Sequence, residues 1–179
     1  MKRCAWCNLN NPKYIEYHDH EWGKLNTDEE YLFEMLILES FQAGLSWQFI
    51  LNKREAFKEA YEDFDIDKVI EFDEEKIEQL RNNPNIIRNK LKIKASISNA
   101  KIFKSIQEEY QTFYDYLCTF THGQIIYETE KTTSALSDSI SNDLKKRGMK
   151  FVGSTIIYSY LQAIGVIYSH EKDCFLYKD

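Results

Sequence analysis

Residues 27–44 read TDEEYLFEMLILESFQAG, and this stretch decides the fold class that the chain can adopt. Thr27 is the expected N-cap, and acidic side chains follow in the first turn, where they stabilise a helix N-terminus. Apolar side chains then recur with the i, i+3, i+4 and i+11 spacing of one helical face, at Leu32, Met35, Leu36 and Ala43. The stretch therefore predicts a helix that packs an apolar face against the rest of the protein.

Glu39 occupies the i+7 position of the same apolar face. Its carboxylate is expected to point into the protein or into a cleft, in the same direction as the leucines. An isolated buried charge is very costly, so this group must be paired, hydrogen-bonded or neutral. Glu39 is therefore a candidate functional residue.

Helical patterns continue along the rest of the chain, beginning with Ser46 as the expected cap of the next helix. Further helices are expected over 47–64, 65–72, 73–83, 113–120, 137–147 and 154–165, and a long helix follows a turn around Pro84 and runs to Tyr110. The chain has only 6 Gly and 2 Pro in 179 residues, too few for the many tight turns of a β-sandwich or barrel. No repeat or linker is visible, so we expect one all-α domain over residues 1–179.

The net charge of −6 conceals a segregation of charge along the chain. Residues 55–78 contain eleven acidic residues and three lysines, whereas residues 81–104 contain seven bases and no acid. A second acid-free stretch, 144–170, opens with LKKRGMK. Phosphate binding depends on the local field rather than on total charge, so the two basic segments permit DNA binding. The alternative is that these lysines simply form solvated helix faces.

The turn around Pro84 lies between two expected helices and is followed by basic residues. Backbone amides at such a turn can hold a phosphate, as in a helix-hairpin-helix motif. The usual Gly-x-Gly of that motif is missing here.

The sequence gives no indication of a secreted or membrane protein. The first twenty residues contain no apolar segment of the secretory type, and 152–169 is uncharged but carries Ser, Thr, Gln and Gly, which favours a buried core helix over a membrane span. Four cysteines in such a chain indicate reduced thiols or metal binding rather than disulfides. We therefore expect a cytoplasmic protein without membrane contact.

Cysteine and histidine pairs near both ends of the chain suggest a structural zinc site. The N-terminal donors are Cys4, Cys7, His18 and His20, and the C-terminal pair is His170 and Cys174 in an H-x-x-x-C spacing. A structural zinc takes four ligands, so two of the N-terminal donors suffice, and spacing alone leaves Cys4/His18, Cys7/His18 and Cys4/Cys7 open. A redox role for the C-x-x-C would require a βαβ context that is not evident.

Aromatic residues cluster in the first 47 positions, near Glu39 in the sequence. Trp6, Tyr14, Tyr17 and Trp22 precede Glu39, and Trp47 follows it. A flat, positively charged guest would suit such a group, because rings offer stacking and cation–π attraction and a carboxylate offers opposite charge. The alternative is that the rings belong to the core and that Glu39 pairs with an internal Arg or Lys.

Six ordered blocks of sequence carry a resemblance to a known family. They are RCAW at 3–6, Y-x-x-Y-H-D-x-E-W-G at 14–23, LESFQAGLSW at 38–47, NIIRNKLKI at 85–93, LKKRGMKFVG at 144–153, and the H-x-x-x-C of 170–174. Together they resemble bacterial 3-methyladenine DNA glycosylase I, a constitutive alkylation-repair enzyme of the helix-hairpin-helix superfamily. The resemblance implies a structural Zn²⁺ that joins the chain ends through Cys4, His18, His170 and Cys174, leaving His20 incidental and Cys7 a spare thiol.

The resemblance also implies an activity, the hydrolytic removal of 3-methyladenine after its nucleotide has been flipped out of double-stranded DNA. Trp47 and Trp6 would stack on the base, Glu39 and Tyr17 would hydrogen-bond its edge, and Tyr14 would line the pocket. Glu39 is expected to act as a reader and electrostatic partner of the cationic base rather than as a strong general base.

Contacts with alkylated DNA are implied for a further set of residues. Leu45 would wedge into the gap left by the flipped nucleotide, and the lysines of 92–103 would touch phosphate. Backbone contacts are expected from Arg88, Lys90, Lys145, Lys146, Arg147 and Lys150. We expect a monomeric, monofunctional enzyme without lyase activity, whose product is free 3-methyladenine. The competing hypotheses are a non-catalytic zinc-stapled DNA- or protein-binding domain and a metallohydrolase that uses His18, Asp19 and His20.

Overall fold

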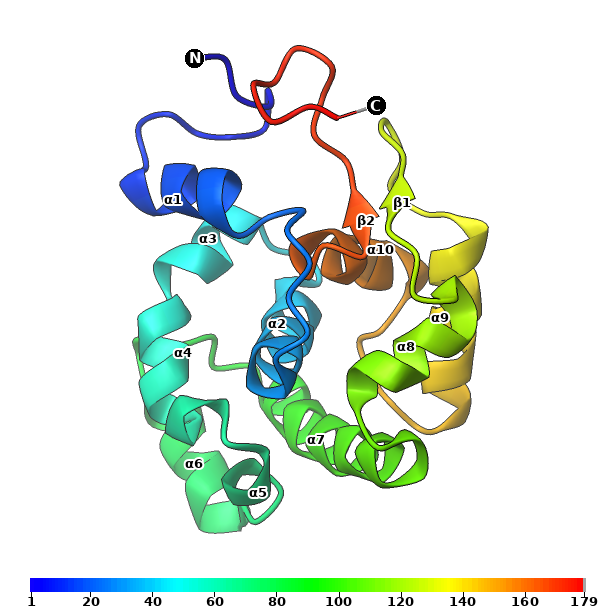
Figure 1. Ribbon diagram of the computed structural model, residues 1–179. Coiled ribbons are helices and arrows are strands. Elements are labelled where there is room, and N and C mark those ends of the chain that lie inside the picture. The colour runs from blue at the N-terminus through cyan, green and yellow to red at the C-terminus, as the bar shows by residue number, and fades with distance from the viewer. Residues whose placement is uncertain (179) are drawn as a thin grey trace.

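The computed structural model describes residues 1–178, and helix α2 (Glu29–Gln42) lies near the centre of the fold (Figure 1). Its N-cap is Asp28, whose side chain accepts a hydrogen bond from the backbone N–H of Tyr31, so the prediction of Thr27 as the cap was wrong by one residue. Residues 32–41 are all buried, which means that α2 is covered on every side rather than along one stripe. A helix surrounded in this way carries Glu39 into the interior.

The other helices surround α2, and α7 (Lys90–Tyr110) and α10 (Ser154–Ala163) pack directly against it. The remaining helical elements are α1 (Pro12–His20), α3 (Trp47–Asn52), α4 (Arg54–Ala60), the 3-10 helix η1 (Glu62–Phe64), α5 (Ile66–Val69), α6 (Glu74–Asn82), α8 (Phe113–Thr121) and α9 (Ala135–Lys146). In Figure 1, α4, α5 and α6 lie on one side of the molecule and α8 and α9 on the other. The predicted helical fold is confirmed.

The single helix expected over 47–64 is divided into three elements. The chain bends at Lys53, between α3 and α4, and the backbone of Glu62–Phe64 is left-handed, with φ of 54°, 57° and 59°. This turn brings the ring of Phe64 onto that of Tyr61, with ring centroids 5.8 Å apart. Core packing of the aromatic rings therefore outweighs the continuation of the helix.

Two short strands were not predicted. β1 (Ile126–Tyr127) pairs in parallel with β2 (Ile167–Tyr168). The apolar stretch 152–169, interpreted from the sequence as a buried core helix, therefore contains a helix followed by a strand. Helix α10 ends at Ala163, and Gly165 makes the turn into β2 with a φ of +78°. Within residues 1–178, no helix is both long enough and apolar enough to cross a membrane.

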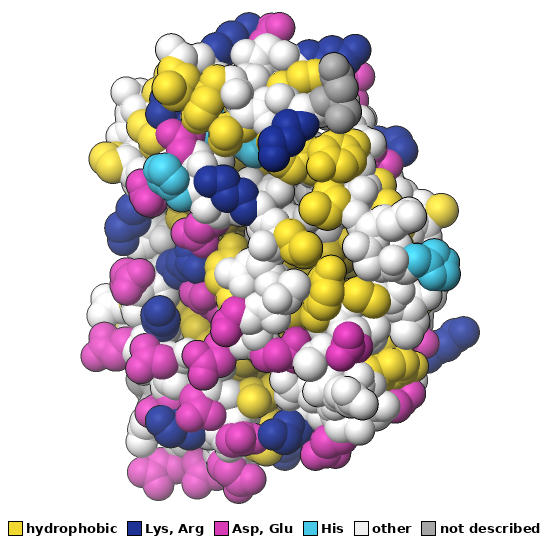
Figure 2. Space-filling view, in the orientation of Figure 1, with side chains coloured by type: hydrophobic (Ala, Val, Ile, Leu, Met, Phe, Trp, Pro, Cys, Tyr) yellow, Lys and Arg dark blue, Asp and Glu magenta, His cyan; other side chains and the backbone are white. Residues whose placement is uncertain are grey.

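Both chain ends lie at the same side of the molecule, beside β1 and β2 (Figure 1). The backbone N–H of Phe175 donates to the carbonyl of Lys2 at 2.9 Å, and one continuous core of buried side chains extends from Cys4 to Cys174. Acidic side chains gather at the opposite end, over α4, α5 and α6 (Figure 2). The basic segment 81–104 does not lie apart from them, because Lys90, Lys94 and Lys104 pair with Glu78, Glu74 and Asp67.

Candidate functional site

A pocket of about 100 Å³ opens beside α2, and it has more room than a single water molecule requires. Its lining comes from the N-terminal segment, α1, α2, α3 and α10, and consists of Trp6, Tyr14, Tyr17, Trp22, Glu39, Gln42, Trp47, Ser159 and Gln162. All five residues predicted to bind a substrate lie in this lining. The fold thus brings together predicted residues that are up to 41 positions apart in the sequence, and α10 adds Ser159 and Gln162.

Aromatic rings form most of the pocket wall. Trp6 packs against Trp22 and Tyr14, with ring centroids 4.7 and 5.4 Å apart, and Tyr17 packs against Trp47 at 5.3 Å. These rings hold one another at tilted angles, which fixes their faces and edges in a defined arrangement. The pocket is therefore suited to a flat ring system.

The carboxyl group of Glu39 is the only acid in the pocket lining, and it is 2% exposed. Its Oε2 has no hydrogen-bond partner within the described residues. The guanidinium of Arg54, which is half-buried, pairs with Glu34 at 2.7 Å and with Glu21 at 2.8 Å rather than with Glu39. Burial raises the pKa of Glu39 well above its ordinary value. The sequence allowed Glu39 to be paired, hydrogen-bonded or neutral. The neutral state is therefore favoured when the pocket holds no cation.

Two further polar atoms in the pocket are buried without a partner in the described part of the chain, Gln42 Oε1 and Trp47 Nε1. Most buried polar groups in proteins are hydrogen-bonded, so three such atoms in one pocket indicate a site built for a polar guest. Gln42 was missed from the sequence, although it lies three residues after Glu39 and hence on the same side of α2. Ser159 and Gln162 were also missed. Their signal is polar residues three positions apart in an otherwise apolar helix.

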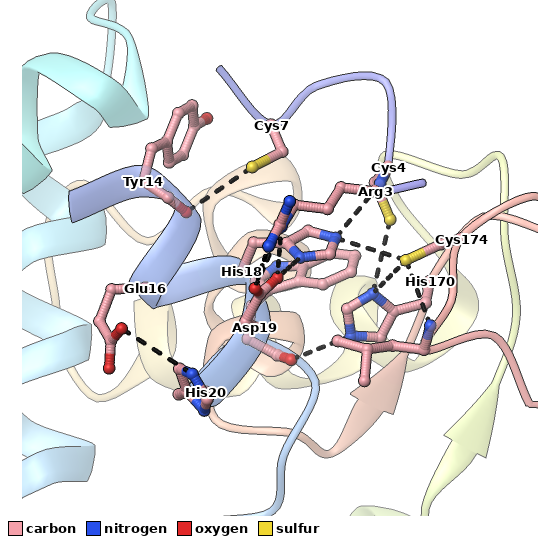
Figure 3. Close-up of polar contacts among 12 residues, drawn as sticks. Arg3, Cys4, Cys7, Tyr14, Glu16, His18, Asp19, His20, His170 and Cys174 are labelled. Carbon is pink, nitrogen blue, oxygen red and sulfur yellow. Dashed lines mark hydrogen bonds and ion pairs between the residues drawn. The ribbon is translucent and has the colours of Figure 1, made fainter. Parts of the chain in front are cut away.

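A second cluster joins the two ends of the chain (Figure 3). The ligand atoms of Cys4, His18, His170 and Cys174 all lie within 4.8 Å of one another, and all four residues are buried. The Nδ1 of His170 is 3.4 Å from the sulfur of Cys4 and 3.6 Å from that of Cys174, which is in turn 3.5 Å from the Nε2 of His18. Two thiols and two imidazoles converging on one point form a donor set that suits Zn²⁺.

Neighbouring groups orient the two imidazoles of this cluster. The Nδ1 of His18 lies 2.7 Å from Asp19 Oδ1, and the Nε2 of His170 lies 3.2 Å from the carbonyl of Trp22. The opposite ring nitrogens therefore face the sulfurs, as in histidines that bind metals. Arg3, and then His18, lower the pKa of Asp19 to about 2, so this carboxylate is charged at neutral pH.

Cys7 and His20 point away from the cluster (Figure 3). The thiol of Cys7 faces the carbonyl of Tyr14 at 3.8 Å, and His20, which is exposed, lies 3.8 Å from Glu16. The donor set that the structure brings together is thus the one implied by the resemblance, and the pairings with Cys7 are not favoured. His18, Asp19 and His20 do not converge, so the geometry does not support a metallohydrolase.

The residues predicted to contact DNA occupy several places on the surface. Leu45 is 39% exposed in the connection between α2 and α3. Arg88 and Lys90 are exposed where the chain enters α7, and Lys145, Lys146 and Lys150 are exposed at and after the end of α9.

Two basic residues are less exposed than the others. Arg147 pairs with Glu109 at 2.6 Å and with Asp143 at 2.8 Å, so its guanidinium holds the end of α9 against α7. Lys92, expected from the resemblance to touch phosphate, is buried, and its ammonium donates to the carbonyls of Phe41 and Ala43. For Lys92 the expectation of a phosphate contact was wrong, because the side chain turns inward toward α2.

The helical fold, the aromatic pocket with its buried carboxyl and the exposed basic segments define a helical domain that can hold a nucleobase. Comparison with known proteins places it more narrowly. The family model for methyladenine glycosylase matches residues 6–177, and the chain belongs to this family.

Individual relatives agree over nearly the whole chain. DNA-3-methyladenine glycosylase 1 of Escherichia coli is 42% identical over 184 residues, covering 99% of this chain and 97% of the relative. A crystal structure of 3-methyladenine DNA glycosylase I superposes with a TM-score of 0.94 at 40% identity, covering 99% of this chain and 100% of that one. A tyrosine-to-phenylalanine variant of 3-methyladenine DNA glycosylase I, in complex with 3-methyladenine, gives 0.92 at 35% identity, covering 98% and 97%.

Proposed function

We propose that the protein is a DNA N-glycosylase that removes 3-methyladenine from alkylated double-stranded DNA in base excision repair. The observation that carries this proposal is the buried Glu39 carboxyl, whose Oε2 faces an aromatic pocket without a partner in the described chain. Membership of the methyladenine glycosylase family and the relative in complex with 3-methyladenine support it. The product is free 3-methyladenine.

The flipped base lies between aromatic faces in the proposed complex. Trp47 and Trp6 stack on it, Tyr14 lines the pocket, and Glu39 and Tyr17 hydrogen-bond its edge. The amino group of adenine is a donor, which suits the free oxygens of Glu39 and Gln42. We add Gln42 to the residues that read the base.

Selectivity follows from the charge of the lesion. Methylation makes 3-methyladenine in DNA cationic, whereas undamaged adenine is neutral. An opposite charge nearby favours ionisation of a buried carboxyl, so the cationic base and the Glu39 carboxylate stabilise one another. Neutral adenine offers no such compensation and would face a protonated acid. Discrimination between the two bases is then a difference in binding energy.

The chemical step needs little acid catalysis. As the glycosidic bond breaks, its electron pair passes to the base, which leaves as a neutral molecule, and the sugar acquires oxocarbenium character. Water adds to the anomeric carbon and loses a proton. Glu39 supplies negative charge beside the cation. We propose simple hydrolysis without a Schiff base, which agrees with the commitment of Lys92 to two carbonyls.

DNA is held in this proposal at a limited set of residues within the basic segments. The turn between α6 and α7 acts as a helix-hairpin-helix motif, with Arg88, Lys90 and the amides at the start of α7 near phosphate. Lys145, Lys146 and Lys150 contact the backbone, and Leu45 fills the gap left by the nucleotide. Arg147 supports the end of α9 through its two carboxylate partners.

One structural Zn²⁺ per chain is proposed at Cys4, His18, His170 and Cys174. Buried thiols close to two oriented imidazoles fit this metal. With four protein ligands the ion has no open position for water, so its contribution is to hold the chain ends together. The core from Cys4 to Cys174 supports a single domain over 1–179. A monomer and a cytoplasmic location complete the proposal; gel filtration tests the first and cell fractionation the second.

The test is release of free 3-methyladenine from alkylated duplex DNA by zinc-loaded protein, with Glu39→Gln alongside. Glu39→Gln is expected to lower the affinity for the excised base more than the affinity for DNA. Glu30→Gln, an exposed position on the same helix, is the matched control and should change neither. Absence of release by the unaltered protein would favour a non-catalytic binding domain, and an unchanged base affinity in Glu39→Gln would refute the role of this residue.

A further inference from the structure

Lys92 belongs to the basic segment 81–104, but its side chain is buried. It lies in the first turn of α7, and its side chain extends to the last turn of α2, 9% exposed. Its Nζ is 2.9 Å from the carbonyl oxygen of Phe41 and 2.5 Å from that of Ala43. None of the ion pairs in the described residues involves Lys92, so backbone carbonyls are its principal partners.

The carbonyls that Lys92 contacts need a donor from outside their own helix. The last carbonyls of an α-helix lack intrahelical partners, and the helix dipole makes this end negative. The last turn of α2 has no basic residue, and at Ala43 the backbone leaves the helical region, with φ of −47° and ψ of 113°. An ammonium group placed here therefore caps α2 in place of a residue of that helix.

The capped end of α2 leads into the connection between the two halves of the base pocket. Glu39 and Gln42 precede it on α2, and Trp47 begins α3 after it. Between them, the backbone N–H of Leu45 donates to the carbonyl of Gln42 at 2.6 Å, and Ser46 caps α3. Movement at Ala43 would displace the proposed wedge, Leu45, whereas the ring of Trp47 is also held by that of Tyr17.

A third segment reaches Lys92 from the other side. The ring of Phe151 lies 5.9 Å from its Nζ, in the stretch that follows α9. Asn99 of α7 holds that stretch in place, since its side chain accepts from the backbone N–H of Lys150 at 2.9 Å and donates to the Lys150 carbonyl at 2.8 Å. Three segments thus meet at the side chain of Lys92: α7, the 43–46 connection and the 148–153 stretch. All three are assigned to DNA contact in the proposed function.

We propose that Lys92 is a positioning residue, which locks the 43–46 connection to α7 so that phosphate binding at α7 sets Leu45 for nucleotide extrusion. This inference rests on the proposed function. It assigns Lys92 no contact with the base or the sugar. Its effect belongs to the flipping step, before the glycosidic bond breaks.

The test compares Lys92→Met, which keeps the length of the side chain without its charge and donors, with Lys92→Arg, which restores charged donors. Lys104→Met is the matched control, because Lys104 lies on the same helix and pairs with Asp67 at 2.8 Å. Three quantities are measured on folded, zinc-loaded protein: single-turnover excision from alkylated duplex DNA, affinity for free 3-methyladenine, and fluorescence of 2-aminopurine placed beside a stable analogue of the lesion. That fluorescence rises when the neighbouring nucleotide leaves the stack.

Lys92→Met is expected to slow excision by about tenfold to a hundredfold, the equivalent of one charge-assisted hydrogen bond, and to suppress the fluorescence rise. Its affinity for free base should stay within about twofold of the unaltered protein, because the pocket residues keep their own neighbours. Lys92→Arg should recover part of both signals, and Lys104→Met should match the unaltered protein.

Three results would overturn the inference: normal excision by folded Lys92→Met, an equal loss of excision and of base affinity, or the same loss in Lys104→Met. If Lys92→Met does not fold, Lys92→Gln, a neutral donor, is judged by the same criteria. Failure of the unaltered protein to release base would count against the proposed function, and the role of Lys92 would then be decided by the fluorescence measurement alone.

Discussion

At the scale of single residues, Glu39 shows how burial can prepare an acid for a cationic ligand. The group lies among aromatic rings, its Oε2 accepts no hydrogen bond from the described residues, and burial raises its pKa well above the ordinary 4.5. In the folded protein it therefore keeps a proton at pH values where the unfolded chain has lost it. This difference has a consequence for stability that can be measured without DNA.

Glu39→Gln should stabilise the base-free protein near neutral pH and have little effect at pH 4. A folded-state pKa raised above the unfolded value gives a contribution that is complete below about pH 4.5 and is lost as pH rises toward the folded pKa. Within that window the difference between variant and unaltered protein should grow by up to about 1.4 kcal/mol per pH unit. Urea unfolding of both proteins across pH 4–8 measures it. Parallel stability curves would show that Glu39 ionises normally in the fold.

Gln42→Met should weaken binding of free 3-methyladenine by about twofold to tenfold, the usual effect of losing one hydrogen bond between neutral groups. The substitution keeps a good helix former of similar length and removes the unpartnered Oε1. Titration of tryptophan fluorescence measures the affinity, and duplex DNA binding should be unchanged. Equal base affinity in the two proteins would place the amino group of the base elsewhere.

The sequence predicted some of these residues and not others, for physical reasons. Glu39 was evident because a carboxylate on an apolar face is costly. Gln42 shares that side of α2, but an amide is easier to bury and so gives a weaker signal. Lys92 could not be foreseen, since lysine is rarely buried and its partners lie 51 and 49 residues away. The carboxylate partners of Arg147 were equally hidden, because one of them is 38 residues distant.

At the scale of elements, the turn between α10 and β2 leaves no room for a side chain at Gly165. The backbone N–H groups of Gly23 and Asn26 donate to the carbonyls of Gln162 and Ile164, both at 3.0 Å. A Cβ on Gly165 would lie 2.1 Å from the carbonyl carbon of Lys24. The segment after α1 is therefore pressed against this glycine, beside the site that joins the chain ends.

Gly165→Ala is expected to destabilise the protein by about 3 kcal/mol or more, because a backbone clash adds to the strain of a positive φ. Gly123→Ala is the control, since Gly123 has a φ of +72° but no atom within 4 Å of the added Cβ. It should cost only about 1–2 kcal/mol. Chemical denaturation compares the two, and similar losses would mean that the contact at Gly165 yields easily.

Helices were the part of the fold most open to prediction. Periodic apolar residues and capping side chains such as Ser46 are local signals, and they located nearly every helix. The bend at Lys53 and the left-handed turn at Glu62–Phe64 arise from aromatic packing, which local spacing does not reveal. The β1–β2 pair has two residues per strand and joins segments far apart in the chain, so it too lacked a local signal.

At the scale of the whole molecule, acidic side chains gather over α4, α5 and α6, whereas lysines and arginines are scattered over the surface (Figure 2). Total charge is negative, so attraction to DNA must come from a limited set of exposed lysines and arginines. The slope of log affinity against log salt concentration therefore reports how many side chains contact phosphate.

Lys146→Ala and Lys150→Ala should each reduce the slope of log affinity against log salt concentration by about 0.9. Lys68→Ala removes an exposed lysine from the acidic end, where it lies near Asp65, and should leave the slope unchanged. Fluorescence anisotropy with a labelled duplex at several salt concentrations gives the slopes. A full slope in both Lys146→Ala and Lys150→Ala would assign the DNA to another face.

Removal of the proposed Zn²⁺ should loosen the fold rather than only halt the chemistry. A ligand bound at a thousand times its Kd stabilises a protein by about 4.1 kcal/mol, so chelation should lower Tm by about 10 °C for a chain of this size. Cys7→Ser should retain one zinc per chain and His170→Ala should not. Metal analysis and calorimetry test both statements: loss of zinc in Cys7→Ser would add Cys7 to the donor set, and retention of zinc in His170→Ala would remove His170 from it.

The position of these ligands along the chain also constrains when the site can form. Cys4 and His170 are separated by 166 residues, so a ribosome makes the first half of the donor set long before the second. Until His170 and Cys174 have been synthesised, Cys4 and His18 can offer an ion only two ligands. Capture of the proposed Zn²⁺ would therefore be among the last events in maturation of the chain, and the early thiols would have to stay reduced until then.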